Sequence, residues 1–129
     1  MIAIDANAMV TMLVDDHELG STTRDLYAAH DLAAPALLGY DVARVLRKLC
    51  QRGLVGERMA DHALRDLKLV RLDTVPYGDI DRRIWELRNN VSPYDAAYVA
   101  VAELLDIPLL TFDDRLRSAP GTHCQFVTR

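Results

Sequence analysis

The chain has 129 residues, half of them hydrophobic, and a formal net charge of −4. These values predict one folded domain over residues 1–129 and exclude a disordered chain. The negative charge argues against a broad, nonspecific nucleic-acid binder, but an acidic active site lowers the net charge by itself, so a nuclease is not excluded. No apolar stretch approaches the roughly 20 residues of a membrane span. The opening residues do not match a signal peptide, so we expect a cytoplasmic protein with no membrane association.

Short apolar stretches alternate with segments of helical periodicity along the chain. Strands are predicted at 1–5, 32–35, 69–72, 109–111 and 125–128. Helices are predicted at about 7–15, 21–30, 36–52, 57–67, 79–88 and from 92 to about 105, with a short helical turn at 114–118. This alternation predicts an α/β fold in which a mostly parallel sheet lies between helices.

Four aspartates occupy informative places in this pattern: Asp5, Asp41, Asp95 and Asp113. Asp5 and Asp113 follow apolar strands, and sites in parallel sheets form at the carboxyl ends of strands. If these two strands are neighbours, we expect the two carboxylates to converge. Clustered carboxylates at buried strand ends are costly, because burial and like charge both raise their pKa values. A divalent cation such as Mg²⁺ prefers carboxylate oxygens and removes both costs.

Three of these aspartates also have structural explanations. Asp5 matches an N-cap of the following helix. Asp95 lies in an N-terminal helix pattern in which Ser92 is the N-cap and a proline takes the first helical position. Asp113 matches a cap as well, but a cap needs one carboxylate only. Asp114 beside it adds repulsion, which favours a charged ligand nearby.

Asp41 falls at the edge of the apolar stripe of its predicted helix. Its position favours an exposed i, i+3 ion pair with Arg44, worth roughly a few tenths of a kcal/mol. The alternative is a carboxylate that faces the site, with Arg44, Lys48 and Arg52 forming a basic rim for phosphate groups, such as those of an RNA backbone.

Four segments carry a resemblance to a known family: Ile4–Asn7, Pro35–Asp41, Ser92–Ala100 and Leu110–Leu116. Together they resemble the PIN domain, and within it the single-domain VapC-type toxins of bacterial toxin–antitoxin pairs. The third and fourth segments are the specific ones, and the resemblance covers essentially the whole chain. It implies a central parallel five-stranded sheet flanked by helices.

The resemblance also implies a metal site. Family positions that match Asp5, Asp95 and Asp113 bind Mg²⁺ or Mn²⁺, whereas the position that matches Asp41 is usually glutamate. Aspartate is one methylene shorter, so Asp41 would act through a bridging water or require its helix to lie closer. Further family positions help to orient the site or cap its helices, and they match Asn7, Ser92, Thr111 and Asp114.

The function that the resemblance implies is a metal-dependent endoribonuclease, a toxin that cleaves transfer or ribosomal RNA. It further implies a cognate VapB-type antitoxin, whose tail lies in an apolar groove, and a homodimer. Four apolar residues either line this groove or belong to the core: Met9, Met12, Leu13 and Leu26.

Two alternatives to the toxin remain. One is a catalytically inactive PIN-fold binding module, which the aspartate at position 41 keeps open. The other is a phosphatase with Asp5 as nucleophile, which is disfavoured because Asn7 stands where a second aspartate is required.

Overall fold

A computed structural model describes residues 1–127 and shows a parallel sheet between helices. The sheet contains β1 (Ile2–Ile4), β2 (Leu32–Pro35), β3 (Leu72–Val75) and β4 (Leu109–Leu110), in the order β3-β2-β1-β4. The helices are α1 (Ala6–Val14), α2 (Glu18–Ala29), α3 (Leu38–Gln51), α4 (Glu57–Leu67), α5 (Asp81–Glu86), α6 (Pro93–Leu105) and α7 (Asp114–Arg117), with a 3₁₀ helix, η1 (Tyr77–Asp79).

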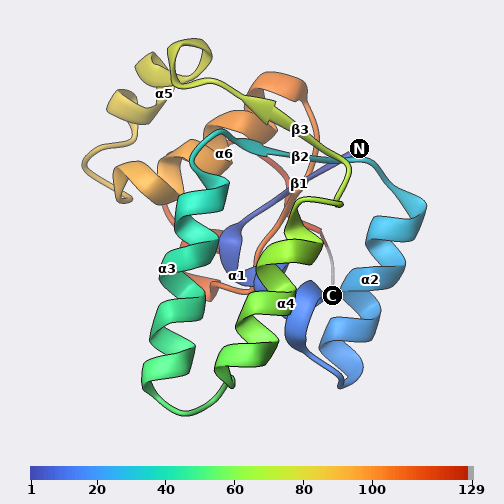
Figure 1. Ribbon diagram of the computed structural model, residues 1–129. Coiled ribbons are helices and arrows are strands. Elements are labelled where there is room, and N and C mark those ends of the chain that lie inside the picture. The colour runs from blue at the N-terminus through green and yellow to red at the C-terminus, as the bar shows by residue number, and fades with distance from the viewer. Residues whose placement is uncertain (128–129) are drawn as a thin grey trace.

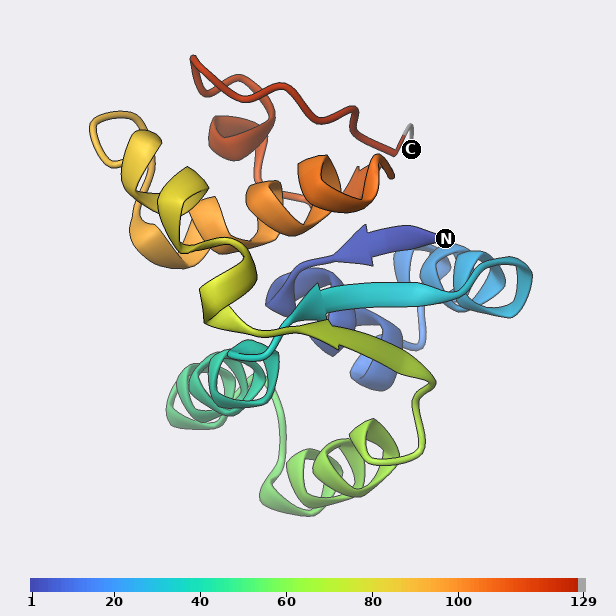
Figure 2. The same ribbon diagram turned by 90° about the horizontal axis from the view of Figure 1, so that it is seen from above.

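The helices cover the sheet from two sides. Figure 1 places α5 and α6 on one side of the strands and α1 to α4 on the other. Seen from above, the strands run side by side between α6 and the pair α3 and α4 (Figure 2). Helix α6 contacts β1, β2 and β4, whereas α1 packs against α2, α3 and α4. No helix within residues 1–127 is long and apolar enough to cross a membrane.

Burial explains why these segments form these elements. Every residue of β1 and β2 is buried, as expected for strands covered on both faces. Helix α6 is buried continuously from Ala96 to Ala102, and its alanines let it lie close to the sheet. Helix α3 is amphipathic instead: of its predicted apolar stripe it buries Leu38, Val42, Val45 and Leu46, while the fifth member, Leu49, is partly buried.

Two predicted strands differ from the structure. The third strand lies at 72–75 and not at 69–72, because the backbone N–H groups of Leu69 and Val70 bond to carbonyls at the end of α4. The predicted fifth strand is reduced to one parallel bridge between Phe126 and Leu109. The sheet therefore has four strands, because β4 offers only two residues for pairing. The last residue of that prediction, at position 128, lies outside the described residues.

The strand order reverses direction between β1 and β4. The chain runs from β1 to β2 on one side, while β4 pairs with β1 on the other. Ile4 and Leu110 are register partners, so the residues that follow them emerge side by side. Such a point, at the carboxyl ends of parallel strands, is where ligands bind in open α/β sheets. The neighbouring strands that the sequence analysis required for convergence of Asp5 and Asp113 are present.

Candidate functional site

Asp5 and Thr111 are the first residues after β1 and β4. The Asp5 carboxylate caps α1, where its Oδ1 accepts the N–H of Ala8 at 2.9 Å. The fully buried Thr111 hydroxyl bonds to Asp5 and accepts the backbone N–H of Asp113 at 3.1 Å. Thr111 therefore joins the two aspartates, and the capping prediction for Asp5 is confirmed.

Burial makes Asp5 an unusual carboxylate. Its side chain is 6% exposed, and burial raises its pKa from 3.8 to about 6. The hydrogen bonds from Thr111 and Ala8 oppose this rise, while the negative charges of Asp95 and Asp41 add to it. Asp5 is therefore ionised at neutral pH, but at a cost that a nearby cation would remove.

Asp95 enters the site from the N-terminus of α6. Ser92 caps this helix, and its Oγ accepts the Asp95 N–H at 3.2 Å, as the sequence predicted. Asp95 is half-buried, and burial raises its pKa. The charge of Asp113 raises it further, whereas Arg44 lowers it. Asp113 is itself the N-cap of α7, and its Oδ1 accepts the N–H of Arg115 at 2.9 Å.

Asp41 is held from both sides. Its Oδ1 accepts a hydrogen bond from Arg44 Nε at 2.8 Å, and the Nη2 of the same guanidinium forms an ion pair with Oδ1 at 2.6 Å. Its Oδ2 accepts the hydroxyl of Tyr98 at 2.7 Å. The predicted pair with Arg44 is confirmed, but its predicted exposure is wrong: Asp41 is only 9% exposed, because α6 brings Tyr98 against it. Burial raises the pKa of the Tyr98 hydroxyl, which stays a donor at neutral pH.

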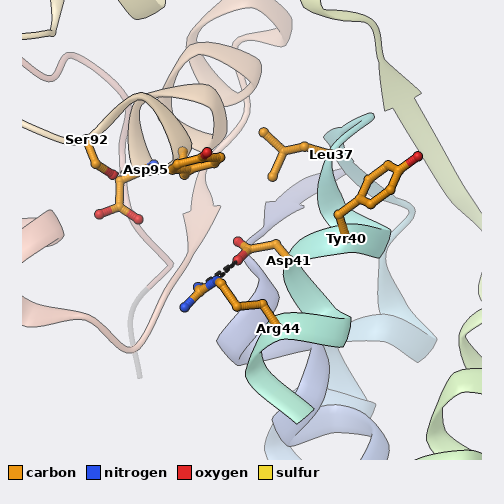
Figure 3. Close-up of a pocket in the computed structure, with 7 residues that line it drawn as sticks. Leu37, Tyr40, Asp41, Arg44, Ser92 and Asp95 are labelled. Carbon is orange, nitrogen blue, oxygen red and sulfur yellow. Dashed lines mark hydrogen bonds and ion pairs between the residues drawn. The ribbon is translucent and has the colours of Figure 1, made fainter. Parts of the chain in front are cut away.

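A pocket of about 470 Å³ lies between α3 and α6. Figure 3 shows the Asp41 carboxylate and the Arg44 guanidinium pointing from α3 toward α6, where Ser92 and Asp95 stand. The pocket is lined by Leu37, Tyr40, Asp41, Arg44, Ser92, Tyr94 and Asp95. Asp5 acts electrostatically on this set, since its pKa responds to both Asp95 and Asp41. The four predicted aspartates therefore belong to one acidic region.

The donor chemistry of this region suits a hard divalent cation. Its ligand atoms are carboxylate oxygens, and their mutual repulsion is what a cation would relieve. Within residues 1–127, no three acidic, histidine or cysteine side chains lie close enough together to enclose a metal ion as they stand. The ligand set Asp5, Asp95 and Asp113 therefore stays a prediction.

The remaining predicted residues surround the acidic region. Asn7 lies on the exposed side of α1, where its backbone carbonyl accepts the Thr11 hydroxyl at 2.9 Å. Asp114 is exposed at the start of α7. Lys48 and Arg52 are exposed and follow Arg44 at helical spacing along α3. Of the predicted basic rim, Arg44 lines the pocket and the other two residues are on the surface of the same helix, and contact with RNA stays a prediction.

The residues proposed for an apolar groove divide into two kinds. Met9 and Met12 are buried in the core, at 0% and 5% exposure. Leu13 and Leu26 are partly buried. A second pocket, of about 380 Å³, lies beside α2 and the end of β4 and includes Leu26 with Phe112.

Three tyrosines were missed by the sequence analysis: Tyr40, Tyr94 and Tyr98. A signal for Tyr98 exists, because it follows Asp95 by one helical turn and so lies on the same side of α6. Its partner Asp41 is 57 residues away in sequence, and that pairing depends on tertiary packing.

Comparison with known proteins agrees with this fold. The PIN domain family model matches residues 2–121. Ribonuclease VapC9 of Mycobacterium tuberculosis is 37% identical over 96% of this chain and 94% of its own length. Ribonuclease VapC1 of the same species is 37% identical over 95% and 92%.

Among solved structures, Mycobacterium tuberculosis VapC20, a toxin that cleaves the sarcin–ricin loop, superposes with a TM-score of 0.69 at 17% identity, covering 95% of this chain and 97% of that one. VapBC2 from Rickettsia felis, bound to a promoter DNA fragment, gives 0.63 at 14% identity over 98% of each chain. These structures share the fold. The chain therefore belongs to the PIN domain family and is a relative of the VapC ribonucleases.

Proposed function

We propose that this protein is a metal-dependent endoribonuclease, the toxin of a VapBC-type toxin–antitoxin pair. One observation carries the proposal: the four aspartates come from separate elements of the chain and influence one another electrostatically at the carboxyl ends of β1 and β4. The identity to VapC ribonucleases over almost the whole chain supports the same reaction.

PIN-domain VapC nucleases generally depend on divalent metal ions, and we assign Mg²⁺ or Mn²⁺ to this site, with Asp5, Asp95 and Asp113 as ligands. When bound, the metal supplies polarisation of the scissile phosphate and a lowered pKa of the attacking water. Thr111 prepares two of these ligands, since its one hydroxyl contacts both Asp5 and the backbone of Asp113. Because the pKa of Asp5 is about 6, the ligand is in its charged form at neutral pH.

The other polar side chains of the pocket have supporting roles. Asp41 orients the attacking water. Hydrogen bonds from Tyr98 and Arg44 to its two oxygens fix the direction of the carboxylate. The Arg44 guanidinium also faces the space where the RNA phosphate would lie, and it matches phosphate geometry. Asn7, Ser92 and Asp114 lie around the metal ligands, where Ser92 fixes the start of α6.

The RNA is proposed to be a transfer or ribosomal RNA, by analogy with the sarcin–ricin loop that VapC20 cleaves. The proposed partner is a VapB-type antitoxin, whose apolar tail would dock in the pocket beside α2 that contains Leu26 and Phe112. We further propose that the protein forms a homodimer and acts in the cytoplasm.

A cleavage assay with purified protein and total RNA tests the proposal. We expect cleavage with Mg²⁺ or Mn²⁺, loss of cleavage with EDTA, and no cleavage by an Asp113→Asn variant. Sequencing the new RNA ends identifies the cut site. Full cleavage in EDTA, or by an Asp5→Asn variant, would contradict the metal-site assignment. A wild-type protein that cuts no RNA with either metal would favour the inactive PIN-fold binding module.

A further inference from the structure

Two exposed tyrosines stand at the acidic pocket without a part in the proposed hydrolysis. The side chain of Tyr40 on α3 is 85% exposed, and that of Tyr94 on α6 is 65% exposed. Both line the same pocket as Asp41 and Asp95. An exposed tyrosine ring is a large apolar surface with a polar tip, and it is typical of places where a ligand covers it.

The placement of these rings follows from the sequence. Each tyrosine directly precedes a site aspartate, as Tyr40-Asp41 and Tyr94-Asp95. Neighbouring residues on a helix point about 100° apart, so each ring stands beside its carboxylate and not over it. A phosphate held by a metal ion at these carboxylates would therefore have aromatic surface next to it, within reach of the base of the same nucleotide or its neighbour.

The pocket can hold such a base. Its volume of about 470 Å³ lies within the ordinary range for a small-molecule site. Leu37 adds an apolar wall on the α3 side, and Tyr40 also lines the pocket, with its ring turned away from Asp95 in Figure 3. Asp41 is the buried polar residue of the same pocket, and the Arg44 side chain beside it is 55% exposed. A pocket lined by an apolar side chain, two aromatic rings and charged groups matches a nucleotide, with its flat base and its charged phosphate.

We propose that Tyr94, with Tyr40 at the rim, forms a base-stacking subsite that holds an unpaired nucleobase next to the scissile phosphate. This inference rests on the proposed cleavage of RNA and names the form of the substrate. Stacking on an aromatic side chain is tolerant of base identity, because every base has a π-face. It requires an unstacked base, so the subsite selects single-stranded RNA, such as a loop, over a duplex.

Fluorescence of a stacked base tests the subsite without cleavage. A mixed-sequence single-stranded RNA that contains 2-aminopurine is titrated with protein in EDTA. We expect quenching by the wild-type protein and by Tyr94→Phe, which keeps the ring. We expect Tyr94→Ala to weaken binding by about tenfold and to abolish most of the quenching. The matched control is Tyr77→Ala, because Tyr77 is 69% exposed but lies on η1, outside this pocket.

Kinetics on a synthetic RNA that carries the mapped cut site give the second readout. Tyr94→Ala is expected to raise KM about tenfold with kcat within about twofold, and Tyr40→Ala to raise KM less. Unchanged quenching and KM in both alanine variants, or equal effects in Tyr77→Ala, would overturn the subsite. If the wild-type protein cuts no RNA but the quenching pattern holds, the proposed nuclease fails while the stacking subsite stands.

Discussion

Helices α3 and α6 each bring an aspartate of their first turn to the same pocket, but the two carboxylates are held differently. Asp41 on α3 has both oxygens engaged, by Arg44 and by Tyr98. Asp95 on α6 is half-buried beside Asp113, and burial and this negative charge both raise its pKa. One carboxylate is balanced by a cation of its own chain, and the other is repelled by a neighbour. Asp95 is therefore the carboxylate suited to an external metal, whereas Asp41 is positioned to assist the proposed hydrolysis.

The largest effect is expected from a change of the α6 carboxylate, Asp95. Asp95→Asn removes a proposed metal ligand, and RNA cleavage should fall at least about a hundredfold. The matched control is Asp106→Asn at the other end of α6, with the same change in charge. Asp106 has a φ of 54°, a left-handed conformation that asparagine accepts. Cleavage by Asp95→Asn within about threefold of the wild type would refute its role as a ligand.

The second prediction concerns the stability that the metal-free protein loses by keeping Asp5 ionised within the carboxylate cluster. The folded protein holds the Asp5 pKa at about 6, above the ordinary 3.8. The folded state therefore binds more protons between these values, so the metal-free protein should lose stability as pH rises from about 4 to about 6. The rise in pKa corresponds to about 3 kcal/mol of unfolding free energy.

Urea unfolding in EDTA measures this cost. Asp5→Asn should remove most of the loss between pH 4 and 6 and be more stable than the wild type at pH 7.5. Mg²⁺ should stabilise the wild type at pH 7.5 and leave Asp5→Asn nearly unchanged. Parallel pH profiles for the two metal-free proteins would contradict the assignment of this cost to Asp5.

The third prediction concerns the hydrogen bond that holds the α3 carboxylate, Asp41. Tyr98→Phe keeps the packed ring but removes the hydroxyl that donates to Asp41 Oδ2. The buried oxygen then lacks a partner, and the unfolding free energy should fall by about 1–3 kcal/mol. We expect kcat to fall by about tenfold with KM unchanged, because Asp41 acts on the water and not on RNA binding. A variant with altered stability but an unchanged kcat would show that Tyr98 is structural only.

The smallest expected effect concerns Arg44. Its side chain is 55% exposed, but its partner Asp41 is buried, so Arg44→Ala should lower the unfolding free energy by about 1 kcal/mol, because Asp41 Oδ1 loses its donor. KM for RNA should rise by about threefold, and the slope of log KM against log salt should fall by about one. Arg65→Ala is the control, because Arg65 is an exposed partner in an ion pair on α4. Equal salt slopes in the two variants would exclude a phosphate contact by Arg44.

The parts of the fold and site that could be predicted from the sequence are those with local causes. Ser92 and Asp95 form a cap pattern within four residues, and the structure keeps it. The apolar stripe of α3 follows from helical periodicity. Asp5 could be assigned to the end of β1 because its apolar run stops there, and its approach to the β4 end required only that the two strands pair.

The parts that could not be predicted depend on distant packing. Asp41 is buried because Tyr98 on another helix packs against it. Helical periodicity within α3 alone predicts an exposed side chain at this edge position. The third strand was misplaced because Leu69, though apolar, is 79% exposed in the turn that ends α4. The predicted fifth strand is not a full strand, because Phe126 pairs only with the two-residue strand β4.

Calorimetric titration with Mn²⁺ tests the division between Asp95 and Asp41 most directly. We expect the wild-type protein to bind Mn²⁺ below millimolar concentration, Asp95→Ala to lose this binding, and Asp41→Ala to keep the wild-type affinity within about tenfold. Equal loss in Asp41→Ala and Asp95→Ala, or no binding by the wild type at millimolar Mn²⁺, would contradict the account.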